Sequence, residues 1–172
     1  MTVEPRILTP QPLTPAVFAQ FGDVIAADAS HDVRLINEGH TQRCHDLAGL
    51  DLLRGGGRPA VSIFRSRPKP APLTLTTMER HPLSSQAFMP LGGRPWLVVV
   101  APAGEFDPAR LVAFLAGPEQ GVNYHAGIWH HYCLALEAES DFLVIDRVGP
   151  GDNCDEVALD PPLRIDPDGV RP

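Results

Sequence analysis

Short β-type segments separated by turn residues limit this chain to a narrow set of folds. The segments are rich in β-branched and other apolar residues, and Gly, Pro and Asp recur between them. They cover residues 60–64, 73–78, 87–91, 96–101, 111–115, 130–136 and 142–148. Turns at roughly 8 to 12 residue spacing are typical of a β-sandwich or barrel. No amphipathic helical run of about ten residues or more interrupts the series, which argues against an α/β fold.

One domain accounts for most of the chain. Its 172 residues are enough to bury a core without disulfides or a structural metal. We expect a β-barrel domain over residues 1–157 and a Pro- and Asp-rich tail over residues 158–172. Thr14 followed by Pro15 predicts a short helix through Phe21, because Thr is a good N-cap and Pro is favoured at the first helical position.

Charge and cysteine content exclude several classes of function. The net charge is −7 and no basic block is present, so neither nucleic acid nor an anionic membrane surface is expected as a partner. The three cysteines lie far apart without a CxxC pair, which argues against a zinc ribbon or a redox motif. The sequence shows no signal-peptide core and no apolar run long enough to span a bilayer. We therefore expect a cytoplasmic protein with reduced thiols.

Two polar stretches interrupt the apolar pattern and are candidates for one site. Residues 79–86 read ERHPLSSQ, and residues 121–132 read GVNYHAGIWHHY. Both match the spacing of the cupin motifs G-x5-H-x-H-x3,4-E-x6-G and P-x-G-x2-H. Glu79 and His81 take the His-x-His positions, Gln86 takes the glutamate position, and His130 is the last histidine. Since residues at i and i+2 of a strand share a face, Glu79 and His81 are expected to point into the barrel together.

Glu79, His81, Gln86 and His130 form a candidate set of metal ligands. Two imidazoles, a carboxylate and an amide make a mixed N/O site of the kind that suits Ni, Mn, Fe or Zn. The set departs from the cupin pattern, because Glu replaces one histidine and Gln replaces the glutamate. A neutral amide is a weak donor, so a polar site without metal is the alternative interpretation.

The remaining histidines are separated by their positions. His125 precedes the final strand of the motif and is a candidate acid or base at the mouth of the barrel. His131 directly follows His130, so within a strand it should face the opposite side as a structural histidine. His31 and His40 are expected on the surface.

Several longer words resemble the ureidoglycolate lyase family. They are ERHPLSSQAFMPL (79–91), EQGVNYHAGIWHH (119–131), DFLVIDR (141–147), FGDVI (21–25), INEG (36–39) and HDLA (45–48). The resemblance covers the chain from about Leu8 to Val157. It implies a cupin-type double-stranded β-helix, or jelly-roll barrel, with a few short helices, assembled as a homodimer. It also implies cleavage of (S)-ureidoglycolate to glyoxylate and urea in allantoin degradation, with a divalent metal, often nickel.

The reaction implied by this resemblance assigns candidate roles for proton transfer. Breaking the C–N bond requires a base for the hydroxyl proton and an acid for the departing urea nitrogen. Glu79 or His130 is the candidate base when the four-residue set holds no metal, and His125 is the candidate acid.

The substrate also needs groups that bind it. Its carboxylate calls for an arginine that can make a bidentate pair. Arg65, at the end of the 60–64 strand, is the preferred candidate, and Arg43 is the second. Tyr124 and Asn37 are candidates for hydrogen bonds to the ureido group.

Two other classes of function stay open at this point. Another small cupin enzyme, such as a metal-dependent isomerase or dioxygenase, would use the same barrel, although a dioxygenase usually needs a more histidine-rich iron site. A non-catalytic ligand-binding cupin would usually carry a DNA-binding or signalling domain, and the chain shows no helix-turn-helix pattern.

Overall fold

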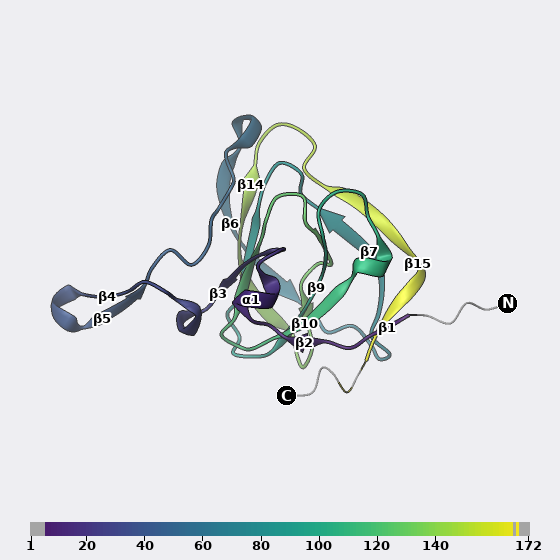
Figure 1. Ribbon diagram of the computed structural model, residues 1–172, viewed down its shortest axis with the longest axis horizontal. Helices are drawn as coiled ribbons and strands as arrows, with labels where there is room; N and C mark the ends of the chain where they lie inside the picture. Colours follow the sequence, from purple (N-terminus) through teal and green to yellow (C-terminus); the bar gives the residue numbers. More distant parts are fainter. Residues whose placement is uncertain (1–5, 167, 169–172) are drawn as a thin grey trace.

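Two curled β-sheets form the body of the protein in a computed structural model, which describes residues 6–166 and 168 (Figure 1). The larger sheet has the strand order β1-β15-β7-β12-β9-β10-β2, and β13 also pairs with β9. Its strands are β1 (Ile7–Leu8), β2 (Gln11–Pro12), β7 (Thr74–Arg80), β9 (Trp96–Ala101), β10 (Val112–Ala116), β12 (Trp129–His130), β13 (Leu134–Ala135) and β15 (Asp155–Ile165).

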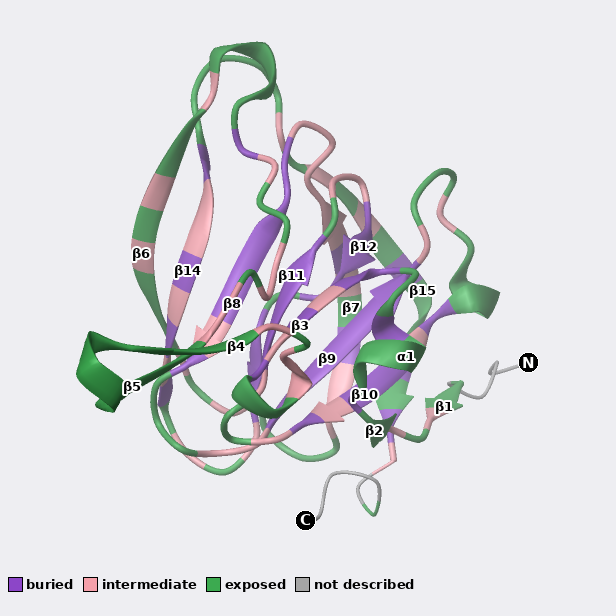
Figure 2. Ribbon diagram, turned by 60° about the vertical axis from the view of Figure 1, so that its left-hand side comes forward, coloured by how far each residue is buried: buried purple, intermediate pink, exposed green. Residues whose placement is uncertain are grey.

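The smaller barrel sheet has the order β3-β11-β8-β14-β6. Its strands are β3 (Gly22–Ile25), β6 (Arg58–Ser66), β8 (Gln86–Pro90), β11 (Gly121–Tyr124) and β14 (Ser140–Val148). The two sheets curl into a half-barrel (Figures 1 and 2). The expectation of a mainly β, cupin-type fold with a few short helices is therefore confirmed.

The main core fills the space between the two sheets. Strands β8, β9 and β11 are buried along most of their length (Figure 2). The centre is aromatic: Phe88 and Phe142 both pack against Trp96, whose indole N–H donates to the Gln120 carbonyl oxygen. A second apolar cluster includes Leu97, Val99, Trp129 and Leu163. Alternate residues of β9 therefore serve two cores, as expected for a strand buried on both faces.

One helix and several 3₁₀ turns connect the strands. Helix α1 (Pro15–Phe18) begins where predicted, because the Thr14 hydroxyl accepts a hydrogen bond from the Val17 N–H. It ends three residues before the predicted end, and the Phe21 N–H then donates to the Phe18 carbonyl oxygen. The 3₁₀ turns in the described ranges cover Ala27–Ala29, Asn37–Gly39, Arg54–Gly56 and Pro108–Arg110.

A hairpin arm projects from the barrel and is built by β4 (Val33–Ile36) and β5 (Thr41–Cys44) (Figure 1). The two strands pair with each other and form a separate sheet. Their residues are exposed, apart from the half-buried Cys44 (Figure 2). At the tip, Asn37 and Glu38 both have positive φ, 53° and 58°, which turns the chain back tightly.

The predicted boundary at residue 157 falls inside β15. This strand pairs with β7 on both sides of a register shift between Ala158 and Leu163, and it continues to Ile165. The described residues 158–165 of the expected tail thus belong to the larger sheet, because Leu159, Leu163 and Ile165 are buried there. Residues 167 and 169–172 of that tail lie outside the described part. Among the described residues, no helix is long and apolar enough to cross a membrane.

Candidate metal centre and active site

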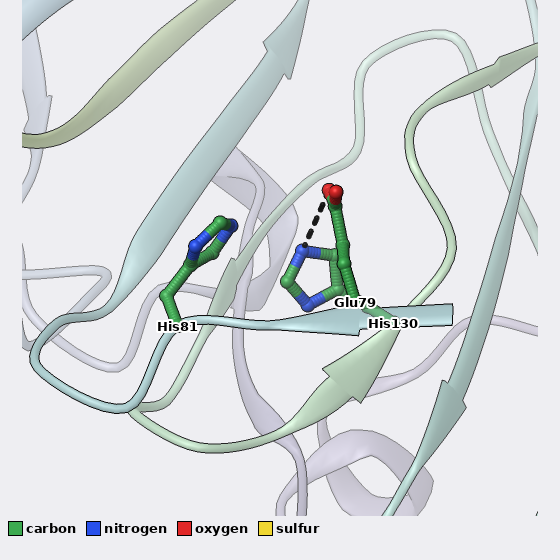
Figure 3. Close-up of side chains that lie close together, drawn as sticks. All are labelled: Glu79, His81 and His130. Atoms are coloured by element: carbon green, nitrogen blue, oxygen red, sulfur yellow. Dashed lines mark ion pairs between the residues drawn. The ribbon is translucent and has the colours of Figure 1, made fainter. Parts of the chain in front are cut away.

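Two neighbouring strands of the larger sheet bring three of the predicted ligands together. Glu79 lies near the end of β7, His81 follows two residues later, and His130 on β12 stands directly opposite Glu79 in the antiparallel register. One ligand atom from each of these side chains lies within 4.8 Å of the others. Figure 3 shows the carboxylate and the two imidazole rings facing one common space.

The fourth predicted ligand comes from the smaller sheet. Gln86 is the first residue of β8, and its Oε1 lies 3.1 Å from His81 Nε2 and 3.2 Å from His130 Nε2. Glu79 Oε1 lies 3.5 Å from the same nitrogen of His130. The fold therefore assembles all four predicted residues at one end of the barrel, from both sheets.

Electrostatics sets the charge of the two central groups. The hydrogen bond with His130 holds the pKa of the Glu79 carboxyl below its ordinary value. Burial lowers the pKa of His130, and this effect outweighs the opposing effect of Glu79. At neutral pH the pair is thus a carboxylate beside a neutral imidazole. These are the protonation states in which both side chains can ligate a metal.

Backbone carbonyls set the tautomers of the two imidazoles. His81 Nδ1 lies 2.6 Å from the carbonyl oxygen of Asn153, and His130 Nδ1 lies 3.1 Å from that of Ile128. A carbonyl only accepts, so the tautomer of each ring that donates from Nδ1–H leaves the lone pair of Nε2 free for a metal. In that tautomer both lone pairs face the oxygens of Glu79 and Gln86.

This donor set fits a divalent metal ion. Four electron-pair donors converge, and the three contacts between them measure 3.1, 3.2 and 3.5 Å. Ligands about 2.0–2.2 Å from one ion lie about 2.9–3.5 Å from each other in octahedral or tetrahedral geometry. His81, His130, Glu79 and Gln86 could therefore hold a borderline metal such as nickel or zinc.

Tyr124 forms a wall of this site. Its ring stacks on the His130 imidazole, with the centroids 4.2 Å apart and the planes 9° from parallel. Burial raises the pKa of the Tyr124 hydroxyl well above its ordinary value, so the phenol stays neutral. Tyr124 therefore lies beside the four donors, and its predicted hydrogen bond to the ureido group stays a prediction.

His125 turns away from the four donors. Its Nε2 lies 3.2 Å from an Asp23 carboxylate oxygen on β3, and the ring is about half exposed. The same oxygen accepts hydrogen bonds from the Asn123 side chain and the Gly49 N–H. His125 follows β11, whose Tyr124 points into the barrel, and its side chain belongs to the opposite side of that strand.

The three other predicted substrate contacts lie away from the donors. Arg65 makes a bidentate pair with Asp141, at 2.8 and 2.9 Å. Asp146 lies at the end of β14 that is nearest Gln86. Asp141 lies five residues earlier on the same strand, so its pair with Arg65 is remote from the donors. Arg43 and Asn37 belong to the projecting arm (Figure 1). The fold does not bring these three side chains to the site within this chain.

Two further residues, which the sequence motifs do not indicate, support the site. Asp146 on β14 accepts a hydrogen bond from the Gln86 amide nitrogen at 3.4 Å. Asn153 anchors His81 through its backbone carbonyl, while its side chain accepts from the Leu83 N–H. The sequence contains a signal for Asp146. Phe142, Val144 and Asp146 are spaced two residues apart, so the three share the face of β14 that lines the core.

Comparison with known proteins is consistent with this geometry. The family model for ureidoglycolate lyase matches residues 5–166. A ureidoglycolate lyase of Burkholderia cepacia is 53% identical over 155 residues, 90% of this chain and 87% of the relative. One of Pseudomonas syringae pv. tomato is 51% identical over 152 residues, 88% and 89% of the two chains. One of Burkholderia mallei is 48% identical over 165 residues, 96% of each. The chain belongs to the ureidoglycolate lyase family.

Proposed function

We propose that this protein cleaves (S)-ureidoglycolate to glyoxylate and urea, in the cytoplasm, as a step of allantoin degradation. The observation that carries the proposal is the convergence of Glu79, His81, Gln86 and His130 at one end of the barrel. A chain of this family with such a group has both a proton acceptor and a set of metal ligands within one site.

Ureidoglycolate carries a hydroxyl, a carboxylate and a ureido nitrogen on one carbon. Cleavage breaks the bond from this carbon to nitrogen and turns the hydroxyl into the aldehyde carbonyl of glyoxylate. One proton therefore moves from oxygen to nitrogen. Glu79 is ionised and half-buried, so it can accept the hydroxyl proton and then deliver it to the departing nitrogen.

His81, His130, Gln86 and one oxygen of Glu79 would hold a divalent cation, which we propose to be nickel, and the second oxygen of Glu79 would remain for the proton. When bound, the ion would lower the pKa of the substrate hydroxyl and supply a countercharge for the substrate carboxylate. The wall made by Tyr124 and His130 would limit the orientations of the substrate. His125 has no step in this mechanism, since its side chain is engaged with Asp23.

We also propose that two copies associate through the outer face of the smaller sheet. The side chains of this face are apolar and half-buried or exposed: Val61, Ile63, Met89, Leu143 and Ile145. The opposite face of the same sheet already lines the core, and the described residues leave these apolar side chains partly exposed.

The hairpin arm adds three exposed apolar residues, Val33, Leu35 and Ile36. An isolated two-stranded hairpin is marginal in water, and packing against a second copy would stabilise it.

A product assay tests the proposed activity. Purified protein would be mixed with racemic ureidoglycolate, with and without chelator and added Ni²⁺, while glyoxylate and urea are both measured. We expect equal amounts of the two products, a rate above the spontaneous background, consumption of one enantiomer, and slower turnover after chelation. Ammonia in place of urea would mean that the ureido group is hydrolysed, and a rate no higher than background would mean that ureidoglycolate is not the substrate.

A further inference from the structure

Asp146 is an acidic residue at the site that has no part in the proton transfer described above. It lies on β14, two residues after Val144, whose side chain is in the main core. Residues two apart on a strand share a face, so Asp146 points to the interior side of the sheet. Its Oδ2 accepts the hydrogen bond from Gln86 Nε2. Asp146 thus contacts the one neutral amide of the set.

The other end of that amide contacts both imidazoles. Gln86 Oε1 lies 3.1 and 3.2 Å from the Nε2 atoms of His81 and His130. In the tautomers that donate from Nδ1–H to backbone carbonyls, both nitrogens carry lone pairs. In those tautomers, which are the ones that can bind a cation, three acceptors face one another at hydrogen-bond distance with no proton to share. A positive ion between them would turn this repulsion into attraction.

A glutamine at this position has a second option that would close the site. Rotating its amide by half a turn would aim the NH₂ group at the two imidazole lone pairs and satisfy them without any ion. The same rotation would aim Oε1 at the Asp146 carboxylate, where two acceptors would meet. Asp146 therefore opposes the orientation that excludes a cation.

We propose that Asp146 is a positioning residue that fixes the Gln86 amide with Oε1 toward the imidazoles, and thereby prepares the four donors for a divalent cation. This inference rests on the metal role in the proposed function. A carboxylate at position 86 would present an oxygen to the metal in either orientation, whereas the Gln86 amide needs Asp146 to present its oxygen. The carboxylate acts through Gln86.

The test is a double-mutant cycle on Ni²⁺ binding, measured by calorimetry with the full-length protein after chelator treatment. Asp146→Asn should weaken Ni²⁺ binding about tenfold or more, since loss of an outer partner of a ligand typically costs 10- to 100-fold. Gln86→Glu presents an oxygen in either orientation, so in that background Asp146→Asn should have an effect about tenfold smaller. Asp146→Ala should behave like Asp146→Asn, which keeps the test valid if one variant folds poorly. Asp141→Asn, on the same strand, is the matched control and should keep wild-type affinity.

Each outcome of the cycle supports or overturns the inference. Equal losses in the wild-type and Gln86→Glu backgrounds would mean that Asp146 acts through its charge alone, and would overturn it. Unchanged affinity in Asp146→Asn would overturn it as well. Wild-type protein that binds no Ni²⁺ would overturn both this inference and the metal role, while the product assay would still decide the lyase activity. Coupled Ni²⁺ binding in a protein that does not cleave ureidoglycolate would leave the inference standing and reject the function.

Discussion

Glu79 is the side chain on which the proposed chemistry depends most directly. Replacing it by glutamine keeps the shape but removes the ionised oxygen that would take the hydroxyl proton. We expect Glu79→Gln to lower kcat by about 10²- to 10⁴-fold, the range for loss of a general base, measured by glyoxylate release at saturating substrate. Glu139→Gln, which changes an exposed carboxylate paired with Arg67, is the control. A Glu79→Gln enzyme within about tenfold of wild type would remove Glu79 from the proton-transfer step.

Arg65 provides a second test at this scale. Its guanidinium is engaged with Asp141 and is mostly exposed, so we expect Arg65→Ala to leave KM for ureidoglycolate within about twofold of wild type. Stability should change little, as is usual for exposed ion pairs. A tenfold or greater rise in KM would restore Arg65 as the group that binds the substrate carboxylate, and steady-state kinetics would show it.

The sequence predicted the four donors because their positions depend on local geometry. Glu79 and His81 share a face through the two-residue period of a strand, and the cupin spacing added Gln86 and His130. Only its place at the end of an apolar strand points to Arg65. The same two-residue period places Arg65 with Val61 and Ile63 on the outer face. Which outward residue meets which neighbour depends on pairing across strands, and a single sequence does not contain that information.

At the scale of elements, most strands were predictable and their interruptions were not. The pattern of residues 130–136 predicts one strand. In the structure His130 pairs with Val100 and Leu134 with Leu97, so the segment from His130 to Leu134 has one residue more than the stretch of β9 that it faces. The extra residue forms a bulge and leaves Tyr132 exposed between buried neighbours. In β15, Pro161 and Pro162 suggested the end of the barrel. They lie within the register shift, where prolines do not break the ladder.

His131, at the start of this bulge, gives a prediction about pH. It is buried, its Nε2 has no hydrogen-bond partner, and burial lowers its pKa to about 4. The unfolded chain takes up this proton near pH 6.5, so stability falls as the pH drops from about 6.5 to 4, by about 3 kcal/mol. We expect metal-free His131→Phe to lose less stability than wild type over that window, in urea unfolding at pH 7 and pH 4. Parallel losses in the two proteins would show that His131 is not responsible.

At the scale of the whole molecule, the apolar outer face predicts association. Ile63 is central to that face and about half exposed in a single chain. If two copies associate as proposed, we expect Ile63→Glu to give a monomer with the barrel intact, because a carboxylate buried in an apolar interface is strongly unfavourable. Light scattering coupled to size-exclusion chromatography would give the masses. Thr76→Glu, at an exposed position of the larger sheet, should stay dimeric. A dimeric mass for Ile63→Glu would place the contact elsewhere, and a monomeric mass for the wild-type protein would reject the proposed dimer.

The ligands are divided between the sheets, with Glu79, His81 and His130 on or beside strands of the larger one and Gln86 on the smaller. An ion held by all four would act as a cross-link at the open end of the half-barrel, where strand ends otherwise separate most easily. Metal binding would then make local opening between β8 and β12 rarer, and the amide hydrogens of these strands would exchange more slowly with solvent. In a cell short of the metal, the enzyme would turn over more slowly and would also be looser at this end of the barrel, so proteases would remove it sooner.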